Sequence, residues 1–450
     1  MESRPLPTFH SLSQKVGAFS ARDKTFLIPQ MNRIGCHLLA AVFQAFGVRA
    51  RVMDTYKGLD LGREFTSGKE CFPCQVTTGD ILHFLEEEKA RLGESFDPED
   101  YIYFMPEAGG PCRFGMYNKF QRIVLDSLPG LENLKIGSLT SDNAYSPVGM
   151  IDEDKATDFR KSAFMSVVAA DILDRLLWRI RPYERDPGLA DALIDEAVTS
   201  MSEAFLRHSE KKEFDTILDR LEEIVRRGGE IMDPSIPRKP LIGIVGEIYL
   251  RTHTQSNQDM IRVLERYGAE VVNASIAEWV NYTAYDRMRE ARIGLCRNLR
   301  LLRFREIRNY ASKIVSYGLD LWYQQSRQDK AYRRLKPIID LPGDHRVGDL
   351  EEVLMQKDLF SFEVGTEACL SIAGIMEYMR EGFNGVVNVY PFTCMPSTIT
   401  SAVVRPIVNR RRLPYLDTPC DGTYQPGREA AIRTFMYQAH QHRDRALQSG

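Results

Sequence analysis

The sequence predicts an α/β protein with two parallel-sheet domains and a helical region between them. Three observations support this fold class. Short apolar segments alternate with helical segments early in the chain, the same alternation returns in its later part, and the stretch between them has helical periodicity only. Such alternation is typical of a parallel sheet covered by helices. A chain of 450 residues is also long enough to form more than one hydrophobic core.

The first α/β domain is predicted over residues 20–150. Its expected strands are short apolar runs bounded by polar or turn residues, and its expected helices carry apolar residues at three- and four-residue steps. The strands are predicted at 23–32, 48–54 and 101–107, and the helices at 35–47, 77–93 and 117–128.

A helical region and linker are predicted over residues 151–237. Leu193, Ala197 and Met201 recur at helical spacing, which indicates a helix with one buried face. The glycine- and proline-containing stretch 226–240, RRGGEIMDPSIPRKP, is the expected linker, because these residues commonly end helices.

The second α/β domain is predicted over residues 238–440, with a helical insertion near 280–335. It repeats the alternation of the first domain on a larger scale. The strands are predicted at 241–250, 269–276, 385–392 and 413–418, and the helices at 257–268, 366–382 and 396–411.

Composition and charge exclude several classes of protein. The formal net charge is only −3, so nothing directs the chain towards polyanions. The Arg-rich stretch 294–313 has apolar residues at helical spacing, and we interpret it as a solvated helix face rather than a nucleic-acid patch. The N-terminus lacks a secretion signal and no early apolar run is long enough to span a bilayer. We therefore expect a cytoplasmic protein with reduced cysteines that binds neither nucleic acid nor membrane.

Four of the eight cysteines follow predicted strands. Open α/β sheets bind ligands outside the carboxyl ends of their strands, so these thiols are expected at the ligand edge. They are Cys36, Cys112, Cys394 and Cys420. Cys296 and Cys369 fall inside predicted helices, where we expect packing thiols.

Cys71 and Cys74 form a CxxC motif in the loop before the helix expected near Thr77. The motif is compatible with a redox dithiol, part of a zinc site, part of an iron–sulfur site or packing thiols. A structural zinc site normally needs a second close pair, and a redox dithiol is expected directly after a strand. A helix N-terminus stabilises a thiolate and an anionic iron–thiolate cluster, which favours iron.

Five segments together resemble one family. They are SGKECFPCQVTTGDIL, GGPCRFGMYNKFQ, GIVGEIYLRT, NVYPFTCMPSTITSAVVRP and RTFMYQA. In this order and spacing the chain resembles the acyl-CoA dehydratase activase-related proteins, relatives of 2-hydroxyacyl-CoA dehydratase and benzoyl-CoA reductase subunits, over residues 25–438.

The resemblance implies two Rossmann-like (flavodoxin-like) domains and a 4Fe-4S cluster held by three cysteines, with one iron position open. Its ligands here would be Cys71, Cys112 and Cys394, with Cys74 and Cys36 as further candidates. Members of the wider family take low-potential electrons from a separate actin-fold, ATP-dependent activase. They use these electrons for reductive or radical chemistry on CoA thioesters.

Several assignments stay open on the sequence alone. Arg113 is a candidate to balance the cluster charge, with a surface ion pair as the alternative. Glu247 and Glu367 follow glycine turns, and we expect each to cap a helix rather than to face a cleft.

The catalytic residues and the substrate are not identified by the sequence. The chain is expected to be a lyase or oxidoreductase subunit and a homo- or hetero-oligomer. The alternatives are a non-catalytic electron-transfer or accessory iron–sulfur protein, and a cluster-free α/β binding protein.

Overall fold

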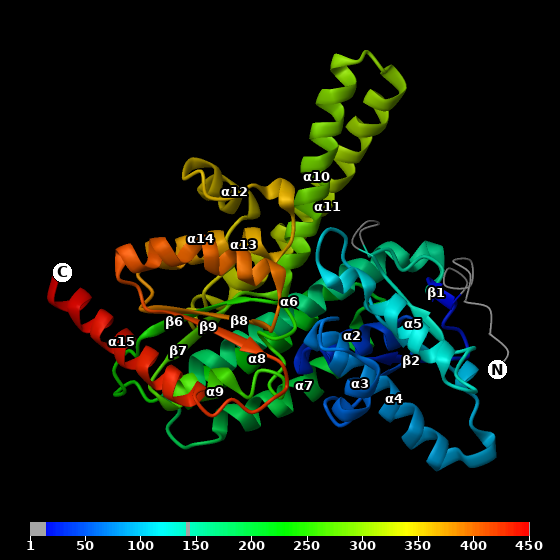
Figure 1. The fold of residues 1–450 in the computed structure, drawn as a ribbon, viewed down its shortest axis with the longest axis horizontal. Helices are drawn as coiled ribbons and strands as arrows, with labels where there is room; N and C mark the ends of the chain where they lie inside the picture. The colour runs from blue at the N-terminus through cyan, green and yellow to red at the C-terminus, as the bar shows by residue number, and fades with distance from the viewer. Residues whose placement is uncertain (1–14, 141–144, 450) are drawn as a thin grey trace. The chain divides into compact units, whose positions relative to one another are not determined.

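The computed structural model describes residues 15–140 and 145–449, and they form two compact units (Figure 1). The first unit contains the described residues up to Ala163 together with Ser202–Phe214. The second contains Phe164–Met201 and the chain from Asp215 onward. The stretch predicted as a helical region, 151–237, thus contributes to both units.

The sheet of the first unit has five parallel strands in the order β1-β5-β4-β2-β3. Strand β4 is buried throughout, and β2 is buried over its last three residues. Strands buried on both faces read as continuous apolar runs, which is why neither shows alternation. The bounds are β1 Val16–Gly17, β2 Thr25–Ile28, β3 Arg49–Val52, β4 Tyr101–Phe104 and β5 Lys135–Gly137.

Helices connect these strands. Asn32 starts α2 as its N-cap, since its side chain accepts a hydrogen bond from the N–H of Gly35 at 2.6 Å. Helices α3 and α4 pack backbone to backbone, because a Cβ on Gly58 would lie 2.1 Å from the carbonyl oxygen of Gly79. The bounds are α2 Arg33–Ala45, α3 Leu59–Phe65, α4 Phe72–Leu92, η1 Gly93–Ser95, η2 Pro98–Asp100, η3 Arg113–Met116, α5 Tyr117–Ser127 and η5 Glu153–Lys155.

The sheet of the second unit has four parallel strands in the order β7-β6-β8-β9. Helices α13 and α14 lie on one face of the sheet, and α9 and α15 lie on the other (Figure 1). The strand bounds are β6 Leu241–Gly246, β7 Glu270–Asn273, β8 Gly385–Pro391 and β9 Tyr415–Cys420. The helix bounds are α8 Phe214–Ile231, α9 Met260–Arg266, α12 Val347–Gln356, η7 Phe362–Val364, α13 Glu367–Arg380, α14 Met395–Arg411 and α15 Arg428–Ser449.

Two long helices, α6 Ala156–Ile180 and α7 Leu189–His208, run through both units. The short helix η6 Arg181–Tyr183 joins them. The predicted insertion is an antiparallel hairpin of α10 Ile276–Arg300 and α11 Phe304–Leu335, which projects from the second unit (Figure 1). A Cβ on Gly294 of α10 would lie 2.4 Å from the Tyr310 ring of α11, so this glycine lets the two helices approach closely.

The α/β class and the parallel sheets are confirmed. The prediction missed β1 and β5, which are too short to show a pattern. Helix α4 starts at Phe72 rather than near Thr77, because Pro73 is tolerated in a first helical turn. The expected linker at 226–240 is wrong in its first part, since α8 continues to Ile231.

The reason lies in the packing of α8. A Cβ on Gly228 would lie 2.9 Å from the Leu176 side chain, so the glycine allows a close helix contact and does not end the helix.

None of the described helices is long and apolar enough to cross a membrane.

Candidate functional site

Strands β3-β2-β4-β5 of the first sheet and β7-β6-β8-β9 of the second both follow the order 2-1-3-4 when numbered along the chain. In this order the chain changes its direction of winding beside the first strand. This topological switch point lies between β2 and β4 in the first unit and between β6 and β8 in the second. The crevice outside the carboxyl ends of such strands is the usual ligand site of α/β sheets. Cys112 follows β4 and Cys394 follows β8, so two predicted ligands occupy equivalent places in the two units.

Cys112 and Cys71 lie on neighbouring loops of the first unit. Cys112 is the N-cap of η3, which continues into α5, and Cys71 is the N-cap of α4. The Arg113 guanidinium donates a hydrogen bond to the carbonyl of Lys69, and this contact ties the two loops together. Arg113 therefore binds the backbone beside Cys71.

Cys71 and Cys74 are buried in the apolar core of the first unit. The prediction that both lie in a loop is wrong for Cys74, which sits in the first turn of α4. Burial raises the pKa of the Cys74 thiol well above its ordinary value, and the charge of Cys71 acts in the same direction. Cys71 itself has a φ of 100°, a backbone conformation that costs free energy for any residue other than glycine.

Cys36 lies in the first turn of α2, at the carboxyl end of β2. Its Sγ donates a hydrogen bond to the carbonyl of Pro29 at 3.3 Å. Burial raises the pKa of this thiol. Cys36 is thus placed at the predicted edge, and its proton is already engaged by the backbone.

In the second unit Cys394 is the N-cap of α14, and it is buried. The preceding residue, Thr393, has a φ of 68°, so the turn that presents Cys394 is strained as at Cys71. Burial raises the pKa of Cys394 to about 12, and the N–H of Ser397 in the first turn of α14 acts in the opposite direction. Cys420 ends β9 and is also buried.

The helices that start at Cys71 and Cys394 share a local pattern. Each has proline as its second helical residue, Pro73 or Pro396. Six residues after the cysteine each has a threonine whose hydroxyl donates to that proline's carbonyl, Thr77 at 2.8 Å and Thr400 at 3.0 Å. The pattern CxPxxxT thus builds the same first turn twice, and it could have been found in the sequence.

A second correspondence relates α4 to α13, because each helix leads into the third strand of its 2-1-3-4 order. Thr366, the N-cap of α13, has a φ of 76°, as Cys71 has a positive φ at the start of α4. In both helices a cysteine lies three residues after the N-cap, and a glycine lies eight residues after it. The matched pairs are Cys71 with Thr366, Cys74 with Cys369, and Gly79 with Gly374.

Glu247 caps the turn after β6 rather than the helix that was predicted there. Its carboxylate accepts hydrogen bonds from the N–H groups of Tyr249 at 3.1 Å and Leu250 at 2.9 Å. Burial, together with the nearby negative charge of Glu367, raises the pKa of Glu247 to about 7. Its charge and that of Glu367 both act on Cys394, so these groups share one edge of the second sheet.

The N-cap of α13 is Thr366, whose side chain accepts from the N–H of Ala368, rather than Glu367 as predicted. The carboxyl group of Glu367 accepts from its own backbone N–H at the start of the helix. Its Oε2 is buried and has no hydrogen-bond partner among residues 15–140 and 145–449. The same holds for Nε of Arg251, which is 7% exposed. Burial raises the pKa of Glu367, and the Arg251 charge acts against this rise.

These two side chains line a small polar cavity at the carboxyl ends of β6 and β7. Its volume is about 10 Å³, close to the space that one water molecule requires. The other polar lining groups come from Glu278, His345, Ser371 and Tyr378. Burial and the charge of Asp344 raise the pKa of Glu278 to about 7. The cavity fits one water between a cation and carboxyl groups, and it is too small for an acyl-CoA.

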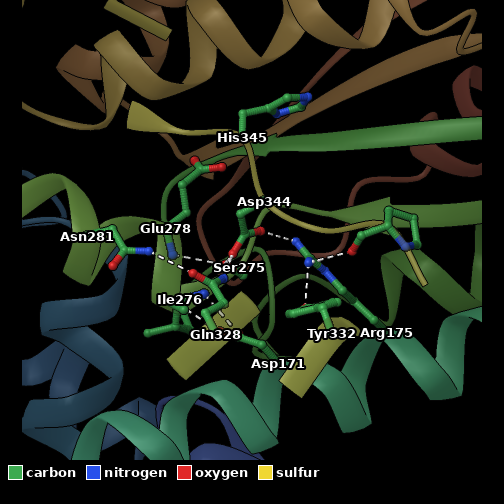
Figure 2. Close-up of polar contacts among 12 residues, drawn as sticks. Asp171, Arg175, Ser275, Ile276, Glu278, Asn281, Gln328, Tyr332, Asp344 and His345 are labelled. Atoms are coloured by element: carbon green, nitrogen blue, oxygen red, sulfur yellow. Dashed lines mark hydrogen bonds and ion pairs between the residues drawn. The ribbon is translucent and has the colours of Figure 1, made fainter. Parts of the chain in front are cut away.

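A buried polar network supports this cavity from the base of the helical hairpin (Figure 2). Arg175 of α6 forms an ion pair with Asp344 and donates to the Tyr332 hydroxyl at 2.6 Å. Asp344 also accepts from Ser275 at 2.5 Å and from Gln328. Both members of the ion pair are 5% exposed or less. Since Asp344 directly precedes His345, the network fixes the loop that borders the cavity.

Asp171 completes the network from α6. Its two carboxylate oxygens accept the N–H groups of Ile276 at 2.9 Å and Ala277 at 2.8 Å (Figure 2). These N–H groups belong to the first turn of α10, where a helix lacks internal partners. Burial and the charge of Asp344 raise the pKa of Asp171 to about 7.

Among the described residues, one trio of potential metal ligands has its donor atoms within 4.8 Å of one another, namely His345, Glu377 and Glu381. Nε2 of His345 contacts Glu381 at 2.8 Å, and Glu377 pairs with Arg380. Each carboxylate already has a partner, so we assign no metal to this trio.

The expectation for the two remaining cysteines is half right. Cys369 is buried in the core of the second unit, whereas Cys296 of α10 is exposed. Cys296 belongs to the projecting part of the hairpin, which has no sheet beside it to pack against.

Comparison with known proteins adds no identity, since no protein-family model and no curated protein matches the chain. Sequence reasoning missed Arg251 and Glu278. Arg251 lies in the turn after β6, just as several of the cysteines follow other strands. A search for any polar residue after a predicted strand, rather than for cysteines alone, would therefore have found it. Glu278 carried no such signal.

Proposed function

We propose that this chain is an iron–sulfur protein related to the 2-hydroxyacyl-CoA dehydratases, and that Cys71, Cys112 and Cys394 ligate a 4Fe-4S cluster. Both units would then be flavodoxin-like, which the 2-1-3-4 strand orders support. Electrons would come from a separate actin-fold, ATP-dependent activase. The substrate would be a CoA thioester or a similar small molecule.

One observation carries the proposal. Each of the three cysteines is the N-cap of a helical segment at the carboxyl edge of its sheet. At a helix N-terminus the unpaired N–H groups and the helix dipole stabilise a thiolate and the negative charge of an iron–thiolate cluster. The N–H of Ser397 acts on Cys394 in this sense.

The proposal assigns iron rather than zinc because the chain has one CxxC pair, whereas a structural zinc site normally needs a second close pair. No disulfide joins the eight cysteines, as is usual for thiols of cytoplasmic proteins, and the proposal places the protein in the cytoplasm. Cys36 and Cys74 are assigned to packing. Cys36 donates its proton to a backbone carbonyl, and Cys74 is fully buried in the core.

When bound, a 4Fe-4S cluster supplies one-electron transfer at a potential that burial and hydrogen bonds to sulfur adjust. The residues of this chain would set that environment. The core around Cys71 excludes water, and Arg113 holds the loop of Cys112 against the loop of Cys71. Glu247 fixes the turn after β6 on the edge that carries Cys394.

The test is the iron content of matched serine variants purified without oxygen. Cys112→Ser and Cys394→Ser are expected to lose most of the iron, because each removes one of three ligands. Cys369→Ser is the matched control, since Cys369 is a buried helix cysteine of the second unit and is expected to leave iron unchanged. Unchanged iron in Cys112→Ser and Cys394→Ser, or zinc in the wild type, would refute the ligand assignment.

A further inference from the structure

The projecting part of the α10–α11 hairpin concentrates exposed apolar side chains. Among residues 15–140 and 145–449, 19 large apolar side chains are exposed, and eight of them lie between residues 293 and 322. Monomeric soluble proteins rarely expose apolar patches of this extent without a binding role. The eight residues are Ile293, Leu299, Leu301, Leu302, Phe304, Val315, Leu319 and Trp322.

Helix α11 has two apolar rows, and one of them is already used. The inner row faces α10, where Ile314, Tyr317 and Leu321 pack with Ala284 and Met288. The outer row lies about 110° further round the helix at 100° per residue. It consists of Phe304, Ala311, Val315, Leu319 and Trp322.

The outer row is open along its whole length. Phe304 is 77% exposed, Val315 62%, Leu319 61% and Trp322 68%. At 1.5 Å per residue the row is about 27 Å long. A helix with apolar faces on two sides buries both when it belongs to a bundle of more than two helices.

The outer row is self-complementary when reversed. Four of its five members are spaced symmetrically about position 313, so that Phe304 pairs with Trp322 and Ala311 pairs with Val315 of a second antiparallel copy. The fifth, Leu319, lies opposite Ile307, which borders the row. In the same register Arg308 lies opposite Gly318, which leaves room for the larger side chain. A two-fold interface requires such symmetric spacing, because a contact between residue i of one copy and residue j of the other is repeated with the two copies exchanged.

The charge distribution selects the antiparallel arrangement. Residues 292–313 contain six arginines and one lysine against one glutamate, a net charge of +6 in a chain of net charge −3. A parallel pair would bring two cationic tips together. The antiparallel pair separates them by about the length of the row, well beyond a Debye length of about 8 Å, and brings each tip towards the acidic remainder of the other copy.

The position of the cations also favours a protein over a lipid surface. A helix that lies on an anionic membrane carries Lys and Arg along its polar face. Here the cations beside the outer row, Arg305 and Arg308, belong to the first two turns of α11 at the tip, whereas Ser312 and Ser316 flank the row further along and Asp320 lies near its end.

We propose that two copies of this chain associate through the outer rows of α11, which pack antiparallel so that the two hairpins form a four-helix bundle. The proposal does not depend on the iron–sulfur assignment. It makes the protein a homodimer whose contact lies on the hairpin.

The first test is sedimentation equilibrium of the full chain at physiological salt, with Val315→Arg and Ser316→Arg as a matched pair. Both residues are exposed on the same helix, but only Val315 belongs to the outer row. The wild type and Ser316→Arg are expected to be dimers. Val315→Arg is expected to weaken the dimer by about 100-fold or more, because it buries an unpaired charge.

The second test fixes the register by disulfide cross-linking in a Cys296→Ser background, which removes the exposed native thiol. Phe304→Cys chains mixed with Trp322→Cys chains are expected to cross-link, and Phe304→Cys chains alone are not. A monomeric wild type, a dimer that Val315→Arg leaves intact, or cross-linking of Phe304→Cys with itself would each overturn the proposal. So would a monomer that binds vesicles containing phosphatidylserine through this hairpin.

Discussion

In the first unit the helix that leads into β4 begins with Cys71, whereas the corresponding helix of the second unit begins with Thr366 and Glu367. Both N-caps have a positive φ, and both helices place a buried cysteine three residues later. The fold therefore provides the same position twice. One unit fills it with a thiol, and the other with a threonine that is followed by the buried carboxyl group of Glu367.

The surroundings of the two edges differ accordingly. Cys71 and Cys74 lie in an apolar cluster of the first unit. The second unit instead gathers Arg251, Glu278 and Glu367 around a cavity of water size. In these sheets the strand order determines where a functional group is placed, and the residue at each helix N-terminus determines its chemistry.

The largest effect on stability is expected from the buried ion pair of the second unit. Arg175→Leu leaves Asp344 without its cation in an environment where both groups are at most 5% exposed. The variant is expected to lose about 3–5 kcal/mol of unfolding free energy. Urea unfolding followed by tryptophan fluorescence checks this, because Trp178, Trp279 and Trp322 all belong to the second unit.

The control for this variant is a surface ion pair of the same unit. Arg346 and Asp329 are each more than 40% exposed, so Arg346→Leu is expected to cost less than about 1 kcal/mol. Equal losses in the two variants would show that the buried ion pair contributes no more to the stability of the second unit than a surface pair does.

The matched glycines of α4 and α13 give the next largest contrast. A Cβ on Gly79 would lie 1.9 Å from the carbonyl oxygen of Gly58, whereas a Cβ on Gly374 would have its nearest neighbour, Val245, at 3.9 Å. Gly79→Ala is expected to destabilise the protein by about 3 kcal/mol. Gly374→Ala is expected to stabilise it by up to about 1 kcal/mol through helix propensity.

Calorimetry of the two alanine variants measures this difference directly. If both substitutions stabilise the protein, the close contact between α3 and α4 is absent. If both destabilise it, the two helices are more alike in their packing than the structure shows.

A smaller, pH-dependent effect is expected from Asp80 of α4. Its carboxyl group is 2% exposed, and burial raises its pKa to about 7. A raised folded-state pKa gives stability that is complete below the unfolded pKa and is lost as the pH rises through about 7. From pH 5 to pH 8 the wild type is expected to lose about 2 kcal/mol relative to Asp80→Asn.

Glu88 on the same helix is the control. Arg91 is the main cause that lowers its pKa to about 2, so its contribution is lost only in strong acid. Glu88→Gln is therefore expected to shift stability by a constant amount between pH 5 and pH 8. Thermal unfolding across this range distinguishes the two carboxyl groups, and a constant offset for Asp80→Asn would contradict the assignment.

The sequence predicted the sheets better than the sites. Buried strands such as YIYF and GIVG are continuous apolar runs, and helix periodicity located α2, α7 and α13. The strands β1 and β5 have only two and three residues and depend on pairing with each other, so no local pattern identifies them. Helix α8 continues through Gly228 and Gly229, where the sequence predicted a linker, because Gly228 packs against Leu176. This contact joins residues that are distant in the sequence.

The cysteines were found because they follow strands, and this criterion works for any residue type. Applied to thiols alone, a position after a predicted strand does not identify Arg251. It cannot identify Glu278 or Asp344 for any residue type, because they belong to a buried region that joins side chains from α6, α10, α11 and the following loop. Such pairs have no fixed spacing in the sequence.

The most direct test of the cluster assignment is the iron and acid-labile sulfide content of the wild-type chain purified without oxygen, with EPR of the reduced protein. About four irons and four sulfides per chain are expected, with a reducible cluster signal. Protein that holds no iron after anaerobic purification, or that holds zinc in its place, would contradict the assignment.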